Sequence, residues 1–181
     1  MEMLDVVNEQ GEPTGEQVER TVAHSQGILH RTAHVWIARM CDGRPQILLQ
    51  KRSMNKDSHP GCYDISSAGH IPAGVDYIPS AIRELEEELG LIVAPEELVD
   101  CGIKRLTIKE NFHGNPFVDR QVSRVFLLWR DLEEEDFHLQ KEEIECVLWV
   151  DYAVCKEAVR NNSIPNCIDL EELEMLEEHL Q

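Results

Sequence analysis

Arg83-Glu84-Leu85-Glu86-Glu87-Glu88-Leu89-Gly90-Leu91 is the stretch on which the interpretation of this sequence rests. It ends a longer segment whose apolar residues, at 78, 81, 82, 85 and 89, repeat at helical spacing, and Gly90 is placed to end the helix. On such a helix Glu84, Glu87 and Glu88 share one face, because they are three and four residues apart. Three converging carboxylates suit a hard divalent cation such as Mg²⁺. The alternative is a solvated acidic face, because like charges cost a helix only about 0.2–0.5 kcal/mol per pair.

The residues around this helix extend the pattern to Gly69-x5-Val75-x7-Arg83-Glu84-Leu85-x-Glu87-Glu88-x-Gly90-Leu91. This pattern resembles the Nudix box, G-x5-E-x7-R-E-U-x-E-E-x-G-U, in which U is a bulky aliphatic residue. Eight of the nine fixed positions match, and the exception is Val75, where the box has glutamate. The resemblance therefore favours the metal-binding reading of the helix over the solvated acidic face.

The resemblance implies an α/β (α+β) fold, the Nudix α/β/α sandwich, with a mixed central sheet and a catalytic loop–helix–loop. It also implies hydrolysis, dependent on Mg²⁺ or Mn²⁺, of a nucleoside diphosphate linked to another moiety. Carried over by position, Glu84, Glu87 and Glu88 are metal ligands, and a backbone carbonyl beside Gly69 completes the site. Arg83 orients the glutamates. The metal polarises the diphosphate and lowers the pKa of the attacking water.

Val75 is the departure from the box. In the family the glutamate at this position pairs with the box arginine and holds the loop against the helix. Asp76 is the neighbouring candidate for that role. The change bears on loop rigidity and on the position of Arg83 more than on the chemistry.

A second resemblance runs from about Leu4 to about Val150 and is to type I isopentenyl-diphosphate isomerase and its hydrolase-like relatives. It is carried by the segments Thr21–His24, Leu29–Arg31, Leu48–Arg52, His59–Gly61 and Asp64–His70. It implies a second metal site, because the isomerase holds a metal with three histidines and two acidic residues. The matching positions here are His24, His30, His70, Asp119 and Gln121, so one carboxylate has become an amide. Each histidine taken singly is better explained by ordinary hydrogen bonding, but three imidazoles together suit a transition metal, and for the set a metal or substrate role is an equal alternative.

The isomerase nucleophile is missing. The isomerase needs a cysteine where this chain has Ser66-Ser67-Ala68, and Cys62 comes too early. We therefore expect a pyrophosphohydrolase on an isomerase-like scaffold. Isomerase activity is one alternative, and a nucleotide-binding module without turnover, favoured only by Val75, is the other.

Basic and acidic residues outside the box supply further candidates. Arg52 and Lys56 align with the isomerase residues that bind diphosphate, and they are equally plausible as surface charges. The segment Glu142-Glu143-Ile144-Glu145 lies where many Nudix enzymes place an extra ligand or base, although a solvated strand end is the better explanation for any single one of its glutamates. The sequence does not choose among its three glutamates.

Composition bounds the partners. The 181 residues, 42% of them hydrophobic, predict a single domain, 1–181. With 17 basic and 35 acidic side chains the net charge is −18, which disfavours nucleic acid and membrane surfaces and leaves a small-molecule diphosphate as the expected substrate. The six cysteines form no C-x-x-C pair, and no signal peptide or membrane span is apparent, so we expect a cytoplasmic protein. The resemblance also makes a homodimer possible.

The rest of the chain predicts strands first and helices late. Strands are expected at 34–40 and 46–50, joined by a turn through Asp42-Gly43, and again at 122–129 and 144–150. Residues 51–61 should form a loop and 150–160 a helix. The acidic tail, about 169–181, carries Leu170, Leu173, Leu176 and Leu180 on one stripe. It predicts an amphipathic helix that covers the core or, alternatively, mediates dimerisation.

Overall fold

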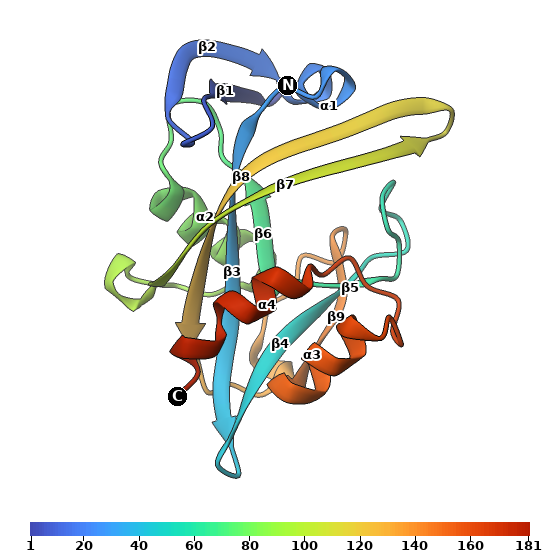
Figure 1. Ribbon diagram of the computed structural model, residues 1–181. Helices are drawn as coiled ribbons and strands as arrows, with labels where there is room; N and C mark the ends of the chain where they lie inside the picture. Colours follow the sequence, from blue (N-terminus) through green and yellow to red (C-terminus); the bar gives the residue numbers. More distant parts are fainter.

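A mixed β-sheet with β3 at its centre organises the fold, in a computed structural model that describes residues 1–181 (Figure 1). β3 pairs in parallel with β8 and antiparallel with β4 and β6. β8 continues antiparallel into β7, and β4 into β5 and β9. The strands of this sheet are β3 (His30–Cys41), β4 (Arg44–Arg52), β5 (Tyr63–Asp64), β6 (Ser67–His70), β7 (Val99–Phe112), β8 (Asn115–Trp129) and β9 (Ile144–Asp151).

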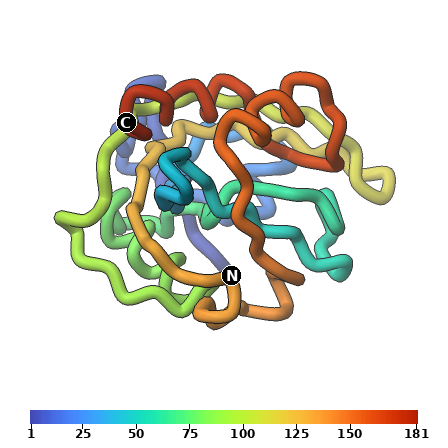
Figure 2. The backbone as a smooth tube through the Cα atoms, turned by 90° about the horizontal axis from the view of Figure 1, so that it is seen from below, coloured from blue at the N-terminus to red at the C-terminus, as the bar shows by residue number.

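Helices cover both faces of the sheet, which confirms the predicted α/β/α sandwich. Figure 2 shows α2 (Tyr77–Leu89) on one side of the strands and the C-terminal helices on the other. These are α3 (Tyr152–Arg160) and α4 (Leu170–Met175). Short 3-10 helices lie at Pro95–Glu97, Glu134–Asp136 and Glu177–His179. No helix has both the length and the apolar character needed to cross a membrane.

β3 is buried on both faces, so its alternating side chains enter two separate cores. Val35 and Ile37 contribute to the core beneath α2, together with Leu85 and Leu89 of that helix. Trp36 contributes to the core beneath the C-terminal segment. A strand that supports two cores explains the nearly continuous apolar run in this part of the sequence.

The predicted hairpin and the glutamate helix are confirmed. Asp42 and Gly43 turn the chain between β3 and β4 with φ of 51° and 75°, values that suit a two-residue hairpin turn. α2 begins at Tyr77, one residue before the predicted start, and Asp76 is its N-cap. Gly90 ends it in the left-handed conformation, with φ of 70°.

Several elements were not predicted. They are β1 (Met3–Val7), β2 (Pro13–Glu19), α1 (Arg20–Gln26), β7 and the short strands β5 and β6. β2 is mostly polar and exposed, and α1 has only seven residues and no side-chain cap, so neither gives a strong pattern. β7 is half-buried along most of its length and is defined by its pairing with β8.

Regular helix covers less of the C-terminal tail than predicted, because α4 ends at Met175 and a 3-10 turn follows. Leu173, Leu176 and Leu180 are buried in the second core. Among the acidic residues of the tail, Glu172 points inward and is only 1% exposed. The predicted acidic outer face therefore contains one glutamate that belongs to the interior.

Glu172 is held by three donors from the sheet. It accepts hydrogen bonds from His34 Nδ1 at 2.8 Å, Trp36 Nε1 at 3.0 Å and Lys104 Nζ at 3.3 Å. Burial alone would raise the pKa of Glu172, but the charge and hydrogen bond of His34 and the charge of Lys104 outweigh it and lower the pKa to about 2.

We predict that this carboxylate makes folding stability sensitive to acid. An unfolded glutamate titrates near 4.5, so the contribution is complete above pH 4.5 and is lost as pH falls toward 2. At 1.36 kcal/mol per pKa unit, the loss is about 3 kcal/mol. Urea unfolding of Glu172→Gln should show a flatter acid limb than wild type, whereas Glu174→Gln, at an exposed site, should follow wild type. Equal slopes for wild type and Glu172→Gln would contradict the prediction.

Candidate functional site

Glu84 lies directly over Gly69, which joins the α2 helix to β6. A Cβ atom built on Gly69 would lie 2.6 Å from Cδ and 2.8 Å from Oε1 of Glu84. Only glycine leaves space for the carboxylate at this position. Gly69 and Glu84, which are far apart in the sequence pattern, are thus in direct contact in space.

Glu88 is the most buried of the four glutamates on α2, with 9% of the residue exposed. Its Oε2 accepts a long hydrogen bond from Gln50 Nε2 at 3.5 Å. Burial raises the pKa of Glu88 well above its usual value, and the negative charges of Glu84, Asp64 and Glu143 raise it further. The pKa of Glu84 is also raised by burial, against the opposing hydrogen bond from Arg83.

This arrangement fits a hard divalent cation. It offers several carboxylate oxygens, and their mutual repulsion would be relieved by a positive ion. Glu87 is different, because its side chain is 55% exposed and its Oε1 lies 3.7 Å from Arg83 Nε. Arg83 also donates from Nη2 to Glu84 Oε1 at 3.2 Å, so one guanidinium touches two of the glutamates.

Arg31 holds the loop that precedes α2. Asp76 was the candidate to pair with Arg83, and this expectation is wrong. Asp76 caps α2 and lies 3.9 Å from Arg31 Nη1. Arg31 Nη2 donates to the carbonyl of Val75 at 2.8 Å and to Asp5 Oδ2 at 3.1 Å. Asp5 Oδ2 in turn accepts from the amide of Gly74 at 2.9 Å. A buried ion pair from β1 and β3 therefore fixes the loop, and nothing in the sequence pattern indicated it.

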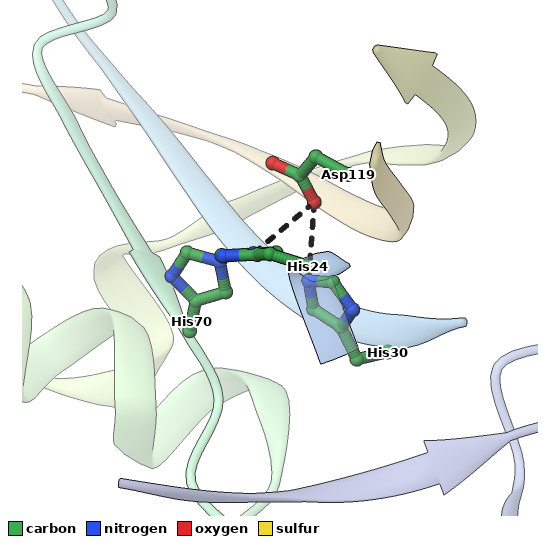
Figure 3. A group of neighbouring side chains, drawn as sticks. All are labelled: His24, His30, His70 and Asp119. Carbon is green, nitrogen blue, oxygen red and sulfur yellow. Dashed lines mark hydrogen bonds and ion pairs between the residues drawn. The ribbon is translucent and has the colours of Figure 1, made fainter. Parts of the chain in front are cut away.

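The predicted histidine group is assembled from four elements that are distant in sequence (Figure 3). His24 comes from α1, His30 from β3, His70 from β6 and Asp119 from β8, and their ligand atoms all lie within 4.8 Å of one another. Asp119 Oδ1 lies 3.2 Å from His30 Nε2 and 3.6 Å from His24 Nε2. His24 Nε2 and His70 Nε2 are 3.1 Å apart. We call these four residues the histidine cluster.

The histidine cluster contains buried polar atoms that lack a hydrogen-bond partner. His30 Nδ1 donates to the carbonyl of Ile28 at 2.8 Å, which fixes the ring with Nε2 facing Asp119. His30 Nε2 and Asp119 Oδ1 are both buried without a hydrogen-bond partner of suitable geometry. Burial lowers the pKa of His24, and it lowers the pKa of His70 further. Three imidazoles and one carboxylate that converge in this way, with two buried atoms left without a partner, fit a transition-metal cation.

The two groups lie on opposite faces of the sheet. In β6, Gly69 pairs with Ala33 and His70 with Thr32, and successive side chains of a strand point to opposite faces. Gly69 therefore meets Glu84 on the α2 side. His70 faces the side covered by the C-terminal segment.

The predicted substrate cations already have partners. Arg52 donates from Nη1 to Asp64 Oδ2 at 3.2 Å and from Nη2 to the carbonyl of Ser58 at 3.0 Å. Lys56 pairs with Glu143. Of the three glutamates that the sequence left open, Glu143 contributes to the field at Glu88, whereas Glu145 pairs with Lys51 and Glu142 is exposed.

Aromatic side chains beside the histidine cluster were missed by the sequence analysis. Phe117 of β8 lies against His24, with ring centroids 4.6 Å apart, and Phe112 of β7 lies 5.1 Å from Phe117. His59 of the 53–62 loop contacts Glu110 at 3.1 Å and so ties the loop to the β7–β8 hairpin. The alternation of half-buried residues in β7 was the signal that could have indicated this face.

Known proteins resemble most of this chain. Residues 30–166 match the family described as the NUDIX domain. A Nudix hydrolase from Clostridium acetobutylicum is 36% identical over 143 residues, which cover 79% of this chain and 66% of the relative. Nudix hydrolase 3 from Arabidopsis thaliana is 40% identical over 153 residues, covering 83% of this chain and 19% of the relative. A Yersinia pestis Nudix hydrolase is 32% identical over an alignment that covers 83% of this chain and 73% of the relative. The chain thus spans less than two thirds of the first two relatives.

Solved structures share the fold at low sequence identity. A crystal structure of a Deinococcus radiodurans protein aligns with a TM-score of 0.67 at 20% identity, covering 95% of this chain and 96% of that one. The Ap4A hydrolase of C. elegans aligns with a TM-score of 0.55 at 20% identity, covering 83% and 96%. These similarities support the architecture of the sheet and its helices.

The contact between Gly69 and Glu84 predicts the effect of Gly69→Ala. The added methyl group must displace the Glu84 carboxylate, and such overpacking costs about 1–3 kcal/mol of stability. In the Glu84→Ala background the same substitution should cost much less, because the displaced group is gone. A double-mutant cycle of urea unfolding measures the difference. An equal cost in both backgrounds would show that Glu84 does not occupy this space.

Proposed function

This chain belongs to the Nudix family, and we propose that it is a divalent-metal-dependent pyrophosphohydrolase. Its substrate would be a nucleoside diphosphate derivative or a related phosphoric anhydride. The observation that carries the proposal is the burial of Glu88 among Glu84, Asp64 and Glu143 on the α2 face. A set of close carboxylates is stable as anions only when a cation joins them.

In this proposal Glu84, Glu87 and Glu88 hold Mg²⁺ or Mn²⁺, together with the backbone carbonyl beside Gly69. When bound, such an ion polarises phosphoryl oxygens and lowers the pKa of a water. Arg83 keeps Glu84 and Glu87 in place through its two contacts. Glu143 is the candidate that accepts the proton of the attacking water, because among Glu142, Glu143 and Glu145 it is the one whose charge acts on Glu88.

Arg52 and Lys56 are proposed to bind the diphosphate. Each would exchange its present carboxylate partner, Asp64 or Glu143, for a phosphate oxygen. Release of Lys56 from Glu143 would at the same time free that carboxylate as a base. Substrate binding and base activation would then be one event.

The compounds named for two structural neighbours support the proposed substrate class. The C. elegans neighbour is an Ap4A hydrolase, and a Shewanella oneidensis NUDIX domain was crystallised with ADP ribose. Both compounds contain phosphoric anhydride linkages. We further propose a small-molecule substrate rather than nucleic acid or a membrane, a cytoplasmic location and a possible homodimer.

Isopentenyl-diphosphate isomerase activity is the alternative that a specific observation favours. The histidine cluster matches the metal site of that branch, and we propose membership of the branch on this ground. The position of the isomerase cysteine is occupied by serines, and Ser66 is fully engaged, accepting from Ile37 N at 2.9 Å and donating to the carbonyl of Leu48 at 2.6 Å. A nucleotide-binding module without turnover is the remaining alternative.

The test is a turnover screen with Mg²⁺ and Mn²⁺ over nucleoside di- and triphosphates, ADP-ribose, other nucleotide sugars, dinucleotides, CoA and isopentenyl diphosphate. In Glu84→Gln and Glu88→Gln the rate of phosphate or pyrophosphate release should fall about 100-fold or more, because each variant loses a metal ligand that supplies several kcal/mol. Glu86→Gln is the matched control, because Glu86 lies on the same helix and is exposed. Binding of a panel compound without turnover would favour the module, and isomerised isopentenyl diphosphate would favour the isomerase.

We also propose that the histidine cluster binds a second, transition-metal cation. Co²⁺ added to the protein should give visible absorption bands that His70→Ala removes. Glu84→Gln should leave these bands in place, because it lies on the other face of the sheet. His113→Ala is the control for loss of a histidine, since His113 is exposed at the hairpin tip. Equal Co²⁺ spectra for His70→Ala and wild type would refute the second site.

A further inference from the structure

A chain of buried polar side chains begins at Asp119 and leads away from the histidine cluster. Gln121 Nε2 donates to Asp119 Oδ2 at 2.6 Å. The other carboxylate oxygen, Oδ1, is the one that faces His24 and His30. Gln121 therefore holds one oxygen of Asp119 and leaves the other directed at the histidines.

The chain continues through two hydroxyl groups between β3 and β8. Gln121 Oε1 accepts from Ser123 Oγ at 3.2 Å and from Thr32 Oγ1 at 3.2 Å. The two hydroxyl oxygens are 2.6 Å apart. Thr32 is 2% exposed and Ser123 0%, so water does not replace these contacts.

The chain ends at the C-terminal segment. Thr32 Oγ1 lies 3.2 Å from His34 Nε2, and His34 Nδ1 lies 2.8 Å from Glu172 Oε1. Glu172 belongs to α4, and Lys104 joins it to Asp169 at the start of that helix. A continuous polar path thus runs from the histidine cluster to α4.

The two ends of the path have fixed hydrogen-bond directions. His34 Nδ1 donates to the Glu172 carboxylate, and the Gln121 amide donates to Asp119. Between them the Thr32 and Ser123 hydroxyls, each with one proton, share the contacts with Gln121 Oε1, with His34 Nε2 and with each other. At the far end Lys104 pairs with the buried Glu172 and with the partly exposed Asp169.

We propose that Gln121, Ser123, Thr32 and His34 are positioning residues that fix Asp119 for cation binding, and that Glu172 anchors them from α4. This inference rests on the proposed second cation site. A carboxylate fixed by outer hydrogen bonds is a better ligand than a free one, and such partners are worth about 10–100-fold in metal affinity. Because coupling is reciprocal, a cation in the histidine cluster also strengthens the docking of α4.

Thr32→Val tests the middle of the path, because it keeps the shape of the side chain and removes the hydroxyl. We expect the Co²⁺ affinity of the histidine cluster, measured by absorption titration, to fall about tenfold or more. Thr32→Ser restores the hydroxyl and should return the affinity close to wild type. Ser66→Ala is the matched control: it breaks two buried hydrogen bonds outside the path, so it lowers stability without lowering Co²⁺ affinity.

Hydrogen exchange tests the far end. Co²⁺ should slow exchange of the amides of Leu173 in α4 and of Leu176, which directly follows α4, in wild type and in Ser66→Ala. In Thr32→Val and Glu172→Gln this slowing should be absent, although both proteins remain folded by circular dichroism. A merely structural role for Thr32 would change the baseline exchange and leave the effect of Co²⁺ intact.

The outcomes separate this inference from the function on which it rests. If wild type binds no Co²⁺ at the histidine cluster, the second site and the inference both fail. If wild type binds Co²⁺ and Thr32→Val binds it equally, with α4 still protected, the second site stands and the inference is overturned. Weaker binding by Thr32→Val with recovery in Thr32→Ser supports it.

Discussion

The parallel pairing of β3 with β8 sets the relative positions of His30 and Asp119 in the histidine cluster. It places His30 opposite Gln121 and Thr32 opposite Ser123, so these two members of the cluster and the polar path follow from one register. A slip of one residue would turn each of these side chains to the other face of the sheet. The same slip would move Ile37 and its apolar neighbours out of their core. The hydrophobic cores on the two faces therefore protect the register on which the polar geometry depends.

The loop before α2 shows how this chain manages without the box glutamate at position 75. In the family pattern that residue would attach the loop to Arg83. Here Arg31 reaches the loop from β3 and bonds the carbonyl of Val75, with Asp5 as its counterion. Because Arg31 is 6% exposed and paired, this attachment is buried and not screened by solvent. Arg83 is thereby left with only glutamates as partners, and both lie on its own helix.

The sequence predicted the local features well and the long-range ones poorly. The glutamate helix, its end at Gly90 and the hairpin at Asp42 follow from periodicity and turn chemistry, which act over a few residues. The histidine cluster was predicted only through resemblance, since its members come from four separate elements. The burial of Glu172 was not predicted at all, because its partners lie on β3 and β7 and nothing in the pattern of the tail distinguishes it from the neighbouring glutamates. The role of Arg31 was invisible for the same reason.

The net charge of −18 gives the two proposed cation sites a common physical cause. A negative field attracts cations and repels the diphosphate that a hydrolase of this family must bind. The two basic residues proposed to bind the diphosphate do not reverse this locally, because Arg52 is held by Asp64 and Lys56 by Glu143. A cation among the glutamates would neutralise the negative charge of Glu88 and its neighbours. It would also offer positive charge to the substrate. For the proposed reaction the ion is therefore as much a condition of substrate binding as of the chemical step.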